Sequence, residues 1–160
     1  MSKRKEALTW VLVTFALVLV GAAAFYVLWP QLQPHATVRI GDGVFKTRVA
    51  TTEEARVQGL SGTTKLAEDR AFLMVFDHEG EWSVWMKDMK YPIDIVWLSH
   101  DKKVVHIVKN APPESYPYEK FTPKKAAKYV LELPAGTVDG KSIIIDSQAA
   151  FDETKLEVSL

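Results

Sequence analysis

One aspartate could do chemistry, because the strand predicted to carry it is apolar on both faces. Asp94 sits in the segment PIDIVWL at 92–98, whose other members are all apolar. Alternate residues of a strand point to opposite faces, so this strand is predicted to be internal. An isolated charge is too costly to bury, so Asp94 needs a cation or several hydrogen-bond donors. The candidate cations are Arg56, on a predicted helix, and Lys87.

The surroundings of this aspartate allow two interpretations. Trp85 and Lys87 alternate onto one face of the segment 81–87. A desolvated acid beside a base and an indole wall is the usual form of a binding pocket. The other interpretation is an ion pair between Asp94 and Arg56 that fixes the helix to the sheet, and spacing alone favours this ion pair.

Composition and motifs exclude several classes of function. Cysteine is absent, which excludes disulfides and thiolate chemistry. Lys and Arg total 20, as do Asp and Glu, so no nucleic-acid partner is expected. His78 lies between Asp77 and Glu79, but neighbouring strand residues point to opposite faces, which favours a solvated turn. We therefore predict no metal and no cofactor.

The N-terminal segment 7–29 lacks charge and is predicted to be a transmembrane helix acting as a signal anchor. The basic flank at 1–6 would stay in the cytoplasm. This arrangement predicts a single-pass protein of the cell membrane with its C-terminal domain outside the cytoplasm. The alternative is a signal peptide cleaved near Ala24, although the apolar run continues beyond that residue.

Beyond a linker at 30–36, residues 37–160 are predicted to form one β-rich domain with one short helix. Thr51 and Glu54 fit a capping box for that helix. The fold class is therefore mainly β (α+β), a compact β-barrel-like or rolled sheet. The expected strands are a hairpin at 37–50 around a turn at 41–43, then 71–76, 81–87, 93–98, 103–109, 128–133, 142–145 and 154–158.

Three segments of this domain resemble a known family. The stretch EARVQGL at 54–60 is similar to an Arg-x-x-Gly-Leu element, and VWMKDMKYPIDI at 84–95 is similar to a Trp-Met-Lys-Asn…Pro-Leu-Asp-Ile core. The stretch YVLELPAG at 129–136 is similar to a Tyr-Val-Leu-Glu-x-x-Ala-Gly element. These elements are those of the domain of unknown function 192 family, also called uncharacterised protein family 0127. They occur in family order over about residues 40–158.

The resemblance implies a compact β-barrel-like fold with a helix packed on it, and no enzyme class. Two departures stand out: the family's Gly-Met-Leu-Phe element reads AFLM at 71–74, and its Asn is Asp88 here. If that amide touches a ligand, this protein's ligand differs. The family motif falls on six candidate pocket residues, Arg56, Trp85, Met86, Lys87, Asp94 and Glu132.

Three functions remain open at this point. The preferred hypothesis is a binding or scaffold module for a cell-envelope saccharide or a partner protein, with contacts supplied by aromatic rings, namely Trp82, Trp85, Tyr116 and Tyr118. The alternative is a cell-envelope hydrolase or lyase in which Asp94 is the acid or base, assisted by Arg56 and Lys87 or paired with Glu132 as in a glycosidase. The third is a subunit that recruits another membrane protein through its N-terminal helix.

Overall fold

The chain divides into two units, Met1–Gln33 and Pro34–Leu160. The computed structural model describes residues 2–28 and 35–156. The predicted linker at 30–36 therefore lies largely outside the described residues, as does the end of the strand predicted at 154–158.

The first unit contains helix α1 (Ser2–Leu28), where the sequence predicts a transmembrane segment. That prediction is wrong, because no helix among the described residues is both long and apolar enough to cross a membrane. The single-pass location, the signal anchor and the extracytoplasmic placement of the domain depended on that span and lose their basis.

A hairpin opens the second unit, as predicted. Strands β1 (His35–Ile40) and β2 (Gly43–Ala50) pair antiparallel. Gly41 makes the turn with φ +52, and a Cβ there would lie 2.1 Å from the Lys141 carbonyl oxygen. A side chain at this position would therefore be strained by its backbone and blocked by a neighbour.

The predicted helix follows the hairpin as α2 (Glu53–Gln58). Its N-cap is Thr52 rather than Thr51, and the Ala55 backbone N–H donates to the Thr52 hydroxyl. The helix ends at Gly59, which has φ +49. Because α2 joins β2 to β3 as a crossover, these two strands run parallel.

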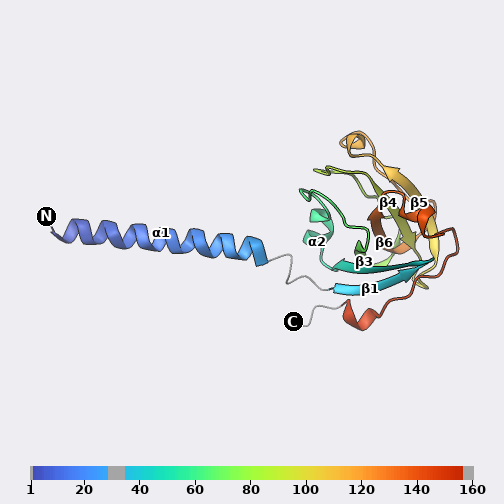
Figure 1. Ribbon diagram of the computed structural model, residues 1–160, viewed down its shortest axis with the longest axis horizontal. Coiled ribbons are helices and arrows are strands. Elements are labelled where there is room, and N and C mark those ends of the chain that lie inside the picture. The colour runs from blue at the N-terminus through green and yellow to red at the C-terminus, as the bar shows by residue number, and fades with distance from the viewer. Residues whose placement is uncertain (1, 29–34, 157–160) are drawn as a thin grey trace. The chain divides into compact units, whose positions relative to one another are not determined.

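The strands form one six-stranded mixed sheet with the order β1-β2-β3-β6-β4-β5 (Figure 1). All neighbours except β2 and β3 are antiparallel. The remaining elements are β3 (Arg70–Gly80), β4 (Ile93–Leu98), β5 (Val104–Ala111), η2 (Pro113–Ser115), β6 (Ala127–Pro134), α3 (Thr137–Gly140) and η3 (Glu153–Lys155).

The predicted β-barrel-like fold is wrong, because the sheet is open; the domain is α+β, with short helices beside a mixed sheet. Closure requires the two outer strands to pair, and β1 and β5 do not pair with each other. The segment 148–150 instead makes one isolated bridge to Arg39 in β1 and another to Lys103, just before β5.

Three predicted strands are also absent from the described residues. Segment 81–87 makes a single bridge, between Val84 and Phe121, although its burial alternates as a strand's would. Segment 142–145 is a turn followed by irregular chain, and η3 occupies the described start of 154–158. In segment 81–87, alternation therefore reports which side chains are buried, not strand pairing.

Two apolar clusters cover the two faces of the sheet. Strand β4 is buried throughout, and its alternate residues divide between the clusters. Val96 and Leu98 belong to the first cluster, together with Leu131 and Leu133 of β6. The second cluster takes the opposite face, where β4 contributes Ile93, Ile95 and Trp97. The face of the sheet to which a β4 or β6 side chain points therefore determines which of the two clusters it contacts.

Candidate functional site

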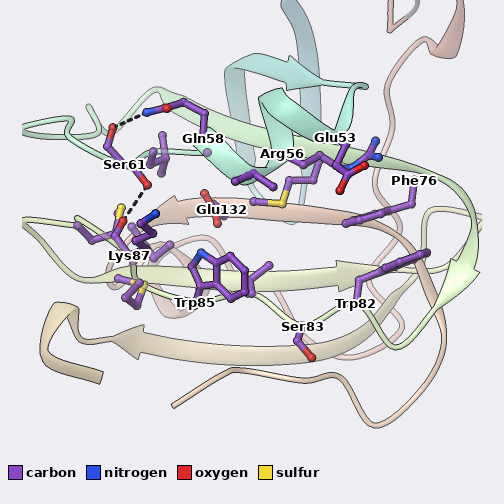
Figure 2. A pocket seen from close by; sticks show the side chains of 18 of the residues that line it. Glu53, Arg56, Gln58, Ser61, Phe76, Trp82, Ser83, Trp85, Lys87 and Glu132 are labelled. Atoms are coloured by element: carbon purple, nitrogen blue, oxygen red, sulfur yellow. Dashed lines mark hydrogen bonds between the residues drawn. The ribbon is translucent and has the colours of Figure 1, made fainter. Parts of the chain in front are cut away.

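A pocket of about 430 Å³ opens beside the second cluster, within the range typical of small-molecule sites. Its walls come from helix α2, from strand β3 and from the segment 82–89 (Figure 2). Apolar side chains dominate these walls, with cations and carboxyls at a few points, and the argument below uses Arg56, Phe76, Trp82, Trp85, Lys87 and Glu132.

The most unusual polar group of the pocket is the carboxyl of Glu132, from β6. Glu132 lies opposite Ile95 on one side and Phe72 on the other, and it is 5% exposed. Its Oε2 atom is buried without a hydrogen-bond partner among the described residues. Figure 2 shows the carboxyl between the side chains of α2 and the ring of Trp85. A buried acceptor left unsatisfied is costly, so this atom marks the place where a ligand group would gain most.

Burial also sets the charge of this carboxyl. Desolvation raises the pKa of Glu132 to about 7, although the positive charge of Arg48 acts in the opposite direction. Near neutral pH the neutral and ionised forms are therefore both populated. The carboxyl can donate a hydrogen bond from one form and accept from the other.

Arg56 is held at the pocket wall by the main chain. Its Nη1 donates to the carbonyl oxygens of Thr51 at 2.7 Å and of Val75 at 2.8 Å. Its guanidinium carbon also lies 4.9 Å from the centre of the Phe76 ring. Arg56 forms no ion pair among the described residues, so its positive charge remains available to the pocket.

Two indole rings form the aromatic wall. Trp82 stacks on Phe76 with ring centres 4.3 Å apart and planes 6° from parallel. Trp85 is 39% exposed, and the Lys120 ammonium lies 5.0 Å from its ring centre. The stack fixes the orientation of Trp82, while the Trp85 ring is reachable from solvent.

Hydrogen bonds join the two loops at the pocket mouth. The Ser61 hydroxyl donates to the Lys87 carbonyl oxygen at 2.8 Å, and the Gln58 amide donates to the Ser61 carbonyl oxygen at 3.1 Å (Figure 2). The Gly62 N–H donates to the Asp88 carbonyl oxygen at 3.0 Å. The end of α2 and the segment carrying Trp85 are thereby held together, which keeps the pocket preformed.

Asp94 does not line this pocket. It is fully buried, and it satisfies its charge with several donors rather than with a cation. Its Oδ1 accepts from the Asn110 N–H and its Oδ2 from the Val138 N–H, both at 2.8 Å. The predicted ion pair with Arg56 or Lys87 is therefore wrong.

The register also separates Asp94 from Glu132. Asp94 lies opposite Leu133, whereas Glu132 lies opposite Ile95. Directly opposed residues share a face of the sheet, so the two carboxyls point to opposite faces. They cannot act on one substrate as a glycosidase pair.

Comparison with known proteins gives the family. The model of DUF192, described as an uncharacterized ACR, matches residues 36–151. The chain belongs to this family. A UPF0127 protein of Thermococcus kodakarensis is 30% identical over 93 residues, which are 58% of this chain and 56% of that protein. A UPF0127 protein of Thermococcus sibiricus is 27% identical over 94 residues, or 59% of this chain and 58% of that one. The match thus spans just over half the length of these relatives.

Solved structures share the DUF192 fold. A Sinorhizobium meliloti protein, provisionally named a transcription regulator, superposes with a TM-score of 0.70 at 24% identity over 74% of this chain and 95% of that one. A Novosphingobium aromaticivorans protein of unknown function gives 0.66 at 23% identity over 72% and 83%. At such identities the likeness concerns the fold alone, and the family has no assigned function.

The structure gathers most of the candidate residues of this DUF192 chain at one place. Arg56, Trp85, Met86, Lys87 and Glu132 line the pocket, whereas Asp94 does not. Of the other proposed aromatic contacts, Trp82 lines the pocket and the two tyrosines at 116 and 118 do not. No group of three or more metal-binding side chains gathers within 2–28 and 35–156.

Sequence reasoning missed Phe76 and Arg48. Phe76 ends the apolar run that predicts a central strand. Nothing in the sequence around it shows that its ring stacks on Trp82. Arg48 alternates with Lys46 on a strand and looks like an ordinary exposed cation. Only the fold brings its charge near Glu132.

Proposed function

We propose that this DUF192 domain is a binding module whose pocket takes a small saccharide. The observation that carries the proposal is the buried carboxyl of Glu132, with an unpartnered oxygen in a preformed pocket. Such an atom is expected to gain a partner when a ligand enters.

The chemistry of the walls supports a sugar. Indole faces, as in Trp82 and Trp85, offer flat apolar contact to the C–H face of a sugar ring. A carboxyl that populates both protonation states near pH 7 can donate to or accept from a hydroxyl. Arg56 and Lys87 supply further donors. A purely apolar ligand would leave these groups unpaired.

Direct titration tests the proposal. Tryptophan fluorescence and calorimetry would be followed while mono- and disaccharides are added to the full chain at millimolar concentration. We expect saturable binding that Trp85→Ala and Glu132→Gln each weaken about tenfold, corresponding to about 1.4 kcal/mol. Tyr118→Ala is the matched control, because Tyr118 is an aromatic residue 92% exposed and outside the pocket. Equal effects of the three substitutions, or no saturable binding, would contradict the proposal.

A second candidate function is an enzyme in which Glu132, rather than Asp94, is the acid or base. A carboxyl pKa of about 7 supports it, because general acids and bases work best with a pKa near the working pH. Asp94, with both oxygens occupied by backbone donors, is a poor acid or base. New reducing ends released from a bound oligosaccharide, and lost in Glu132→Gln, would distinguish catalysis from binding.

A further inference from the structure

A second groove, of about 200 Å³, gathers cationic side chains on β1, β2 and β3, on the same face of the sheet as the second apolar cluster. Lys46, Arg48, Arg70 and Lys65 line it together with His35. The chain as a whole has a formal net charge of +0, so this concentration of positive charge is local.

The strand register places two of these cations directly opposite each other. Lys46 of β2 lies opposite Arg70 of β3, and Arg48 of β2 lies opposite His35 of β1. Lys46 and Arg48 are two residues apart and therefore share one face of β2. Like charges placed directly opposite on a sheet destabilise it. Lys46 and Arg70 are such a pair, and Arg48 adds a third positive charge two residues along β2 from Lys46.

The protein supplies little of that negative charge. Arg70 meets the exposed carboxylate of Asp69, with 3.8 Å between Nε and Oδ1. Lys46, Arg48 and Lys65 form no ion pair within the part of the chain that the structure describes, and the one carboxyl whose charge acts on Arg48 is that of Glu132, at the boundary with the first pocket. The charges of the groove are therefore only weakly balanced.

Arg48 is also held in place before any ligand arrives. Its Nη2 donates to the Gly59 carbonyl oxygen, and its guanidinium carbon lies 4.6 Å from the centre of the Phe72 ring. An arginine fixed in this way loses little freedom on binding and has further N–H donors to offer.

We propose that this groove binds a phosphate dianion, either free or as the terminal group of a small phosphorylated molecule. A dianion matches a cluster of several cations better than a monovalent anion does, and arginine and lysine are the usual donors to phosphate. A groove of this volume accommodates one compact group rather than a length of polyanion. The proposal does not depend on saccharide binding in the first pocket.

The two pockets share a boundary, which gives the proposal a second readout. Leu60 lines both, and the charge of Arg48 acts on Glu132 across that boundary. An anion beside Arg48 would offset its charge and so weaken its effect on the carboxyl. Phosphate is therefore expected to raise the Glu132 pKa further.

The test is a calorimetric titration of the full chain with inorganic phosphate at low ionic strength, because salt screens exposed charges. We expect saturable binding that the double variant Lys46→Gln/Arg70→Gln weakens about tenfold. Lys125→Gln is the matched control, since Lys125 is an exposed lysine outside both pockets and should bind as the parent does. The double variant should fold, because it removes a repulsion, and its thermal midpoint without phosphate checks this.

Glycerol phosphate in place of inorganic phosphate distinguishes the two sources of the group. Tighter binding of the monoester supports a phosphorylated small molecule, and tighter binding of inorganic phosphate supports the free ion. Absence of saturable binding, or equal affinity in the parent and in a folded double variant, would overturn the proposal.

Discussion

The two faces of the central strands each bury one carboxyl, and the two carboxyls differ in their hydrogen bonding. On one face Asp94 of β4 is fully buried, and each of its oxygens accepts a backbone N–H at 2.8 Å. On the other face Glu132 of β6 is 5% exposed, and its Oε2 has no partner among the described residues. The two residues lie on adjacent interior strands, so their position within the sheet does not explain the difference.

The difference separates a structural acid from a candidate functional one. Asp94 ties β4 to Asn110 at the end of β5 and to Val138 in α3, which contributes to stability. Glu132 is desolvated without such compensation, and it adjoins a pocket of about 430 Å³. Groups kept in an unfavourable state beside a cavity are typical of functional sites.

The largest expected effect comes from removing the structural acid. Asp94→Ala leaves the N–H groups of Asn110 and Val138 without their acceptor, so we expect the free energy of unfolding at pH 7 to fall by about 4 kcal/mol. Urea denaturation measures this. Asp139→Ala, which removes an exposed carboxylate paired with Lys109, is the control and should cost about 1 kcal/mol or less. Similar losses in both variants would remove the distinction between the two faces.

The second effect depends on pH and concerns the candidate functional acid. In the unfolded chain Glu132 loses its proton near pH 4.5, whereas in the folded protein it does so near 7. Ionisation therefore favours unfolding, and stability is lost as pH rises through this window. The stability advantage of Glu132→Gln over the parent should grow as the pH rises from 4.5 to 7. Above pH 7 this advantage in the free energy of unfolding should be about 3 kcal/mol. Denaturation at pH 4 and pH 8 measures the gain, and a difference that does not change with pH would contradict the assignment.

A smaller loss of stability is expected when the N-cap of helix α2, which forms part of the pocket wall, is removed. Thr52→Ala removes the acceptor for the Ala55 N–H at the start of α2, the helix that carries Arg56. The expected loss is about 1 kcal/mol, with weakened saccharide binding. Thr52→Ser keeps the acceptor and should restore both. A serine variant as weak as the alanine variant would show that the cap is not the cause.

The smallest effect links the two pockets. Arg48→Gln removes the positive charge that acts against the raised pKa of Glu132, so that pKa should rise further. The shift would be followed as a change in the pH dependence of stability. Lys125→Gln, which lies outside both pockets, should leave the pKa of Glu132 unchanged. A fall in the pKa of Glu132 when Arg48 is replaced would contradict the coupling.

Local chemistry made part of this molecule predictable from its sequence. The turn at Gly41 and the helix start at the Thr51–Thr52 pair signal their elements through short-range constraints, although the cap is Thr52 and not the predicted Thr51. The apolar run at 71–76 gives a central strand, because only such a strand is covered on both faces. Five of the six positions that matched the family motif line one pocket.

The remainder depends on contacts between distant segments. The donors to Asp94 lie 16 and 44 residues away along the chain, and alternation reveals the face of a side chain but not its partners. For the same reason, the alternating segment 81–87 forms a pocket wall rather than a strand. Whether a sheet closes into a barrel depends on which strands pair. The number of strands in the sequence does not determine that pairing.

The central claim, that Glu132 is a desolvated acid in a pocket, has a direct test. Carbon-13 NMR of the full chain with labelled glutamate would follow the side-chain carboxyl of Glu132 through a pH titration, assigned by its absence in Glu132→Gln. The structure predicts a midpoint of about 7. A midpoint near the ordinary 4.5 would show that the carboxyl is solvated, and would contradict the account.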